Sequence, residues 1–472
     1  MPNSQESLTP APAAVSPTRH KLLRLLGKRL RQLAWATLGL AVVVALAMTF
    51  WWFTILRGLP DIGDPFDVAA LRELTIPDDQ NAFTFLRRAH EALTPLPELP
   101  RAVKNAAPTV DWSQADPKLR AWVEANRAAL ELFQQGADQS DGIWQRADMP
   151  YWQRCRDGWW RYRIFHGGLM WLALLEGGRH AESGDPAGAW DCYRAVLRMT
   201  THLRRRGSLT LRYHANTIHT QLRQRLATWA ADPRTTVPQL RRALDEALAS
   251  QTSPEWDALS LKLEYLEMMR YLEQQSHSAN YQAIEEHLIY HLGPIEVPSD
   301  LSIYVFAGRR FLMREPERSR RVLRLLFANW LAHVEVPEPR QSRPAVRASF
   351  LIEKRITTLP LYPVSPQAPA GARVLSPLDL ASWLVTINDA RPWLGGFLWP
   401  SVRNQERRGY RDLVVLLATE LYRRERGGLP RTEEALVGTY LQVLPDDGSA
   451  ELDDGTTPTV TDSHVAAAAQ PR

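Results

Sequence analysis

The longest apolar run of the chain covers residues 33–56 and contains no charged side chain. At about 1.5 Å per residue, a helix of this length reaches roughly 36 Å, which exceeds the roughly 30 Å hydrocarbon core of a bilayer. A core helix of a soluble protein rarely stays apolar on every side for so long. The pattern predicts a transmembrane helix.

A cleaved signal peptide is the alternative interpretation of this run. Ala45-Leu46-Ala47 offers small side chains at a plausible cleavage position. We favour an uncleaved anchor, because the basic region before the run is long for a signal peptide. The run also continues through Trp51, Trp52 and Phe53, which suit the aromatic belt at a membrane surface.

Charge on the two sides of the run predicts its orientation. The fourteen residues before it carry six basic side chains, whereas residues 57–79 carry two arginines against six carboxylates. Basic residues stay on the cytoplasmic side of a span. We therefore expect a single-pass protein with its N-terminus in the cytoplasm and the bulk of the chain extracytoplasmic.

Beyond the span, apolar residues recur at steps of three or four, which is typical of helices with one buried stripe. Asp116-Pro117, Asp185-Pro186 and Ser253-Pro254 predict helix starts, and Thr236 with Gln239 predicts a capping box. The two clearest stripes consist of Ala189, Tyr193, Val196, Leu197, Thr200 and Leu203, and of Leu211, Ala215, Ile218, Leu222, Leu226 and Trp229.

Alternation of period two is hard to find, so we expect a mainly α fold, a helical bundle or stacked helical hairpins, with any strands confined to a small C-terminal α(+β) module after about residue 426. The expected segments are a disordered basic tail at 1–32, the span at 33–56, a linker with one short helix (Asn81–Leu93) at 57–111, the helical domain at 112–358, a proline-rich linker at 359–378, the module at 379–450, with a helix at Arg407–Arg426, and a disordered tail at 451–472.

The net charge of +5 does not indicate a nucleic-acid partner. Residues 1–32 hold six basic side chains and one glutamate, which leaves 51 charges of each sign in the rest of the chain. The exported body is therefore neutral, and the basic balance reports membrane topology.

Aromatic and arginine side chains are concentrated in residues 144–171, where they form a candidate ligand surface. If exposed, such a surface stacks on sugars or pairs with anions; if buried, it is a core covered by arginine stems. We favour the core, because tryptophan is highly buried on average. The candidate ligand residues are Trp152, Arg156, Trp159, Trp160 and Arg163.

Histidine patterns give no convincing site. Glu286-His287 and His291 place two imidazoles at i and i+4, but the sequence is not His-Glu-x-x-His and offers no third ligand. A catalytic triad could be drawn from His202, His214 and His219 with Ser208 or Asp191. However, His214 and His219 are five residues apart, so on one helix they diverge by about 140° and do not converge on one substrate. We assign no catalytic residue, and we expect neither a metal nor a cofactor.

The two cysteines, Cys155 and Cys192, are predicted to be free thiols. If Gly184-Asp185 turns a helical hairpin, about 30 Å separates them along the helix axis, whereas a disulfide needs Cα atoms within about 7 Å.

Two segments resemble known families. The first segment contains Gly177, Gly184-Asp185, Ala189, Tyr193 and Ala195-Val196, and this pattern is similar to one tetratricopeptide hairpin. The pattern is not repeated at the 34-residue period of a tetratricopeptide array. The second segment contains Tyr422-Arg423, Gly427-Gly428, Pro430, Leu436-Val437, Tyr440-Leu441 and Leu444-Pro445-Asp446. It resembles the soluble C-terminal pattern of type II secretion pseudopilins.

The overall layout resembles that of uncharacterised single-span proteins of planctomycete-type bacteria, which implies the bacterial inner (cytoplasmic) membrane. The chain departs from true pseudopilins, because its apolar run lacks a prepilin cleavage motif. Its aspartates at 446, 447, 453 and 454 also lack calcium-ligand spacing. The resemblance identifies a module without a reaction.

Two function classes remain open. The first is a membrane-anchored extracytoplasmic interaction or scaffold protein with a protein partner in the cell envelope. The second is a cell-envelope hydrolase or carbohydrate-binding protein that uses the stretch at 144–171. We favour the scaffold, because no carboxylate or histidine with a clear partner is identifiable in the sequence.

Overall fold

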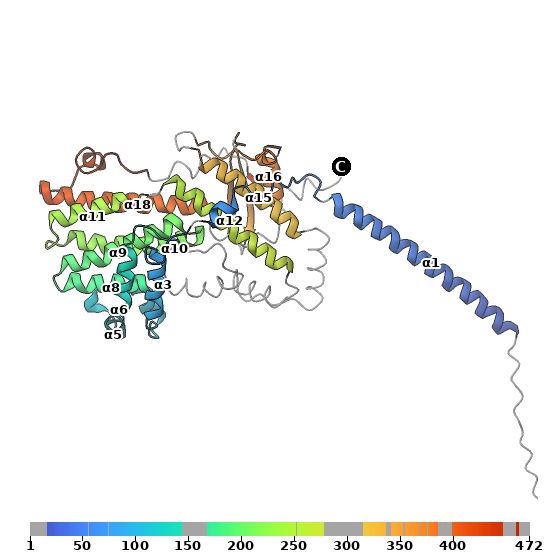
Figure 1. Ribbon diagram of the computed structural model, residues 1–472, viewed down its shortest axis with the longest axis horizontal. Coiled ribbons are helices and arrows are strands. Elements are labelled where there is room, and N and C mark those ends of the chain that lie inside the picture. The colour runs from blue at the N-terminus through green and yellow to red at the C-terminus, as the bar shows by residue number, and fades with distance from the viewer. Residues whose placement is uncertain are drawn as a thin grey trace, which may run out of the picture. The chain divides into compact units, whose positions relative to one another are not determined.

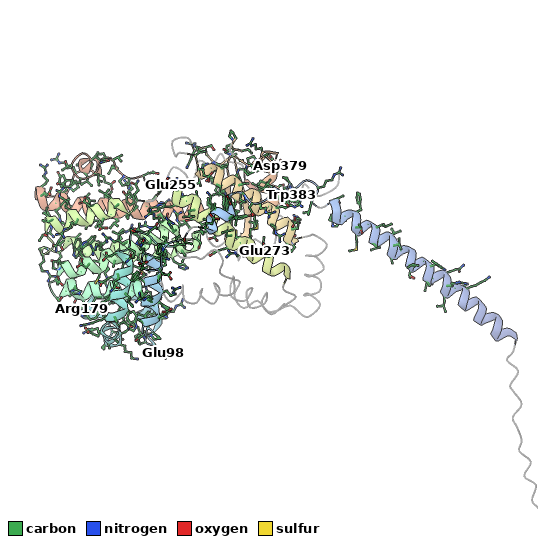
Figure 2. All side chains as sticks on the ribbon, in the orientation of Figure 1. Glu98, Arg179, Glu255, Glu273, Asp379 and Trp383 are labelled. Carbon is green, nitrogen blue, oxygen red and sulfur yellow. The ribbon has the colours of Figure 1, made fainter. Side chains whose placement is uncertain are left out.

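The computed structural model describes residues 17–143, 168–277, 315–336, 341–385, 399–446 and 459–461, apart from residues 55, 74, 252, 353, 354, 367 and 375. The protein is mainly helical, which confirms the predicted fold class (Figure 1). The elements are α1 (Pro17–Thr54), α2 (Val68–Arg72), α3 (Ala82–Ala92), α4 (Arg101–Ala106), η1 (Trp112–Gln114), α5 (Pro117–Ala125), α6 (Arg127–Ala137), α8 (Leu169–Glu182), α9 (Pro186–Arg206), α10 (Leu209–Ala231), α11 (Val237–Ala249), α12 (Pro254–His277), α15 (Glu315–Val334), β1 (Val346–Ile352), β2 (Arg355–Leu361), η3 (Ala372–Val374), α16 (Pro377–Leu384), α18 (Trp399–Arg426), η4 (Glu433–Leu436) and β3 (Thr459–Thr461).

Helix α1 lies in one compact unit, and the described elements from Leu59 onward lie in a second, which we call the body. Among the described residues, α1 holds the one stretch long and apolar enough to cross a membrane, the 24 residues Lys28–Trp51. None of that stretch is buried within the protein, and Leu40, Leu46 and Phe50 are 64% to 72% exposed. Its length and composition suit a membrane span or a signal anchor.

The first part of the body is a set of packed helices. Helix α3 packs on α6, α8 on α9, α9 on α10, and both α10 and α11 on α18 (Figure 1). The two predicted stripes of α9 and α10 form the centre of their shared core, since all twelve of their residues are at most 1% exposed. The helical periodicity therefore identified the buried faces correctly.

The predicted helix starts are also present. Asp116 and Asp185 each accept a hydrogen bond from a backbone N–H of the first helical turn, at 2.8 and 2.9 Å. The backbone N–H of Thr236 donates to Gln239 at 2.8 Å, which completes the capping box. Each contact satisfies an N–H group that the helix itself leaves unpaired.

Helices α8 and α9 form a hairpin whose turn and close approach both depend on glycine. Gly184 has a φ of +85° in the turn, a conformation that favours glycine. A Cβ atom on Gly177 would lie 2.4 Å from the ring of Tyr193, so the aromatic ring fits only against a glycine. The hydrogen bond from the Gly188 N–H lowers the pKa of the Asp185 carboxyl, which also contacts His180 at 2.8 Å.

The second part of the body combines α12, α15 and α16 with a three-stranded sheet. Strand β1 pairs antiparallel with β2 and parallel with β3, in the order β2-β1-β3. Val346 opposite Leu361 and Ala348 opposite Leu359 form its buried face. The side chain of Asn329 on α15 exchanges two hydrogen bonds with the backbone of Tyr362, which holds α15 against the end of β2.

The position of these strands corrects one sequence expectation. We expected strands only after about residue 426 and a helical chain through 358, but β1 and β2 occupy 346–361. The apolar alternation is interrupted in the sequence, because three apolar residues follow one another at 350–352 and Pro360 lies within β2. An interrupted pattern is too weak to separate a strand from a loop.

Part of the expected linker at 57–111 belongs to the body. The short helix is present as α3, with Asn81 as its N-cap, and Phe83, Leu86 and Ala89 lie in the same core as α8 to α10. Helix α4 occupies part of the proline-rich stretch that follows. Proline spacing alone did not reveal these contacts.

The first residues of the body, Leu59–Phe66, form a strap that is fixed to its helices. Leu59 is 1% exposed, and its carbonyl accepts a hydrogen bond from Arg321 at 3.0 Å. Asp61 pairs with Arg324 at 2.7 Å. Further contacts join Ile62 to the loop at Gly371, and both Asp64 and Phe66 to Tyr265.

Cys192 is a free, buried thiol, as predicted. Burial raises its pKa to about 12, so it is an unreactive apolar residue of α9. Cys155 lies outside the described residues.

Adjacent glycines of α8 provide a matched test of the hairpin. Gly177→Ala forces a methyl group into the Tyr193 ring and is expected to lower the free energy of unfolding by about 1–3 kcal/mol. Gly178→Ala meets only the end of Arg225 at 3.4 Å and is expected to be neutral or stabilising, because alanine favours helix. Urea unfolding of the two variants measures the difference, and equal stabilities would contradict the close approach.

Candidate functional site

The predicted ligand surface lies outside the described residues. Trp152, Arg156, Trp159, Trp160 and Arg163 all fall in the range 144–167. Trp171, at the end of the aromatic stretch, belongs to α8 and is 5% exposed in the core. This residue therefore follows the core interpretation, and the five candidate ligand residues stay untested.

The histidines do not form a site in the described part of the chain. Glu286, His287 and His291 lie outside it. His202 and His219 are buried on α9 and α10, while Asp191 is an exposed residue near the start of α9. Across the described ranges, no three histidine, cysteine or acidic side chains gather as metal ligands.

The most concentrated chemistry of the body is a network of buried charges. Arg212 of α10 donates from Nε to Glu406 of α18 at 2.8 Å and makes a second bond to the same carboxylate through Nη2. Its Nη1 lies 2.7 Å from the carboxylate of Asp257 on α12. Arg403 of α18 pairs with the other oxygen of Asp257 at 3.1 Å. Two guanidinium groups and two carboxylates thus join three helices.

The turn between α9 and α10 is fastened beside this network. Ser260 of α12 donates to the Gly207 carbonyl at 2.7 Å and accepts from Arg212 at 3.3 Å. The N–H of Leu209 donates to the Glu264 carboxylate at 3.1 Å. A negative charge from α12 therefore lies at the positive end of the α10 dipole.

Burial controls the protonation of this region. It raises the pKa of Glu406, although the charge and hydrogen bonds of Arg212 act in the opposite direction. It also lowers the pKa of His219, and the nearby charges of Arg204 and Arg223 add to that effect. Burial and the charge of Arg403 lower the pKa of His333 to about 3. Both imidazoles are neutral at physiological pH.

The network is closed to solvent. The side chains of Arg212 and Glu406 have no exposed surface, and those of Asp257 and Arg403 are 5% and 3% exposed. General acid-base catalysis needs a group within reach of the substrate proton. The arrangement is therefore suited to fastening helices, with each charge neutralised by a neighbour.

This network was not predicted from the sequence, although a signal for it exists there. Arg212, Asn216 and His219 recur at steps of four and three beside the apolar stripe of α10, a spacing that places them on one face. All three are buried, and Asn216 donates to the Val402 carbonyl of α18 at 3.2 Å. A polar stripe is ordinarily interpreted as a solvent-exposed face.

Comparison of the chain with protein-family models, curated proteins and solved structures finds no match in any of the three. The resemblances to tetratricopeptide hairpins, pseudopilins and planctomycete proteins therefore rest on the sequence motifs alone. The structure contains the α8–α9 hairpin as a local feature and does not show family membership.

Removal of the central guanidinium tests the network. Arg212→Met leaves two carboxylates buried with reduced pairing, and we expect it to lower the free energy of unfolding by about 3–5 kcal/mol. The control is Arg223→Met on the same helix, since Arg223 pairs with Asp412 at a partly exposed position. That pair is expected to contribute at most about 1 kcal/mol. Denaturant unfolding measures the free energy of unfolding of both variants. Similar decreases in the two variants would contradict the assignment.

The buried histidines predict a pH dependence. The pKa of His219 is lower in the folded protein than in the unfolded chain, so the unfolded state binds the proton more readily. The stabilisation that results from neutral His219 should therefore be present above about pH 6.5. The free energy of unfolding should decline as the pH falls below that value. The free energy of unfolding that is lost between pH 7 and pH 5.5 should be about 1 kcal/mol smaller in His219→Leu than in the unchanged protein. Thermal or urea unfolding at both pH values measures this, and an unchanged pH dependence would contradict it.

Proposed function

We propose that the protein is a membrane-anchored extracytoplasmic scaffold, which presents a helical body to a protein partner in the cell envelope. The observation that carries the proposal is the succession of an apolar helix, none of whose 24-residue apolar stretch is buried, and a strap fixed to the body. The chain from Thr54 to Leu59 spans at most about 18 Å when extended. The connection between α1 and the body is therefore short.

The buried chemistry supports the same proposal. Arg212, Glu406 and Asp257 tie helices to one another at the centre of the body, and the strap adds the pair of Asp61 and Arg324. Interactions of this kind maintain a fixed shape. A body of fixed shape that is attached to a membrane is what a scaffold requires.

The charge asymmetry around α1 supports an N-terminus in the cytoplasm, and the resemblance to bacterial single-span proteins supports the inner membrane. A cleaved signal peptide would release the body from the membrane. The proposal therefore makes retention of residues 33–56 in the mature protein its central requirement.

Expression of the full chain in a bacterial host tests anchoring and orientation. We expect the protein to stay in the membrane pellet after carbonate extraction, and a chain lacking residues 1–56 to be released. Protease added outside the inner membrane should digest the body and leave a short N-terminal fragment. Release of the full-length protein, loss of residues 1–47 by cleavage, or protection of the body would each contradict the proposal.

The expressed protein also distinguishes the scaffold from the alternative function, a carbohydrate-binding protein that uses residues 144–171. Retention of the protein on insoluble cell-wall glycan, abolished by Trp159→Ala with Trp160→Ala, would favour a carbohydrate-binding function. No retention is expected of a scaffold for protein partners.

A further inference from the structure

Helix α1 is longer than a membrane span requires. It extends over 38 residues, from Pro17 to Thr54. At about 1.5 Å per residue it is about 57 Å long, whereas the hydrocarbon core of a bilayer is about 30 Å thick. The uncharged part of the helix begins only at Leu33. The part of α1 before Leu33 therefore lies outside the hydrocarbon core, at the N-terminal end of the span.

Basic residues of this outer part share one face of the helix. They recur at steps of three, four and three, which is the spacing of a helical face. This basic face consists of Lys21, Arg24, Lys28 and Arg31. Two further arginines lie in the same stretch. Positive charge is thus concentrated along about three turns of α1, directly before the span.

Leucines occupy the opposite face. Leu22, Leu26, Leu30 and Leu33 recur at steps of four, four and three. Leu26 and Leu30 follow Arg24 and Lys28 by two residues each, which separates them by about 160° around the helix axis. Helices with a basic and an apolar face are typical of segments that lie at a membrane surface.

The basic face has no carboxylate to neutralise it within α1. No acidic residue occurs between Glu6 and Asp61 in the sequence. Lys28, Arg29 and Arg31 are exposed, and none of them forms an ion pair with a residue that the structure describes. Their positive charge is therefore available to an anionic partner outside the chain.

The membrane itself brings anions to this face. Residues 28–31 are at most five residues from Leu33, which places them within about 8 Å of the hydrocarbon core. That is the depth of the lipid headgroups, where anionic phospholipids carry their phosphates. Clusters of four to eight basic residues beside a span are typical of segments that bind such lipids. Headgroup phosphates are thus the nearest anions to the basic face.

We propose that residues 19–32 of α1 bind the headgroups of anionic phospholipids, in the leaflet at the N-terminal end of the span. This inference rests on the proposed membrane anchor. The segment approaches the leaflet with its leucine face toward the acyl chains, and its basic residues pair with phosphates around it. Gly27 is a weak helix former between this segment and the span, and it allows the helix to bend toward the leaflet.

The test uses the full-length protein in nanodiscs of two compositions, phosphatidylcholine alone and phosphatidylcholine with an equal amount of phosphatidylglycerol. Mass spectrometry follows hydrogen–deuterium exchange of the backbone amides at 17–32. The two leaflets of a nanodisc are identical, so the orientation of the span does not affect the result. We expect exchange to be at least tenfold slower with phosphatidylglycerol. The difference should disappear in about 1 M NaCl, where the screening length falls to about 3 Å.

Two matched variants locate the binding. The neutral variant combines Lys21→Gln, Arg24→Gln, Lys28→Gln and Arg31→Gln, and it should exchange at the same rate in both kinds of nanodisc. The control combines Lys21→Arg, Arg24→Lys, Lys28→Arg and Arg31→Lys, which keeps every charge and should keep the slow exchange. Slow exchange that persists in the neutral variant, or that is lost in the control, would overturn the proposal.

Equal exchange of the unchanged protein in the two kinds of nanodisc would also overturn it. If an added single-stranded RNA oligonucleotide then slowed the exchange, the partner of the basic face would be a nucleic acid. Release of the protein in the carbonate extraction test, by contrast, would refute the membrane-anchored scaffold, while the reconstituted full chain would still report lipid binding. The two failures are therefore distinguishable.

Discussion

The structure of the body depends on the double pairing of Arg212 with Glu406 and Asp257. Arg212 and Glu406 are 194 residues apart in the sequence, yet their side chains meet where no solvent reaches them. Removing these charges from water costs more than any single pair recovers, so the arrangement is stable only when all partners are present. That condition fixes the positions of α10, α12 and α18 together.

This constraint explains the division between the interior and the surface. The charges of Arg212, Arg403, Asp257 and Glu406 neutralise one another away from solvent, whereas the pairs along α18 remain partly exposed beside apolar side chains. The interior therefore provides rigidity, and the outer face of α18 provides accessible chemistry. The strap is held on the body by Arg321 and Arg324.

Local pattern was sufficient where one strong signal determined the structure. The stripes of α9 and α10, the caps at Asp116, Asp185 and Thr236, and the glycine turn at Gly184 follow from helical spacing and backbone geometry within a few residues. The hairpin of β1 and β2 did not, because its apolar alternation is interrupted by three successive apolar residues at 350–352 and by Pro360. Helix α3 was identified as a helix, but its place in the core depends on α6, which is distant in sequence.

The sequence by itself determined the apolar span, its charge asymmetry and the helical class of the body, because each depends on the local order of residues. Only the tertiary structure decided which polar residues are interior. Arg212, Asn216 and His219 have the spacing of a solvent-exposed face, yet all three are buried. Helices α12 and α18 supply Asp257 and Glu406 to pair with Arg212, and a backbone carbonyl of α18 accepts a hydrogen bond from Asn216. The pairing of distant charges is a property of the folded chain, and no window of the sequence contains both partners.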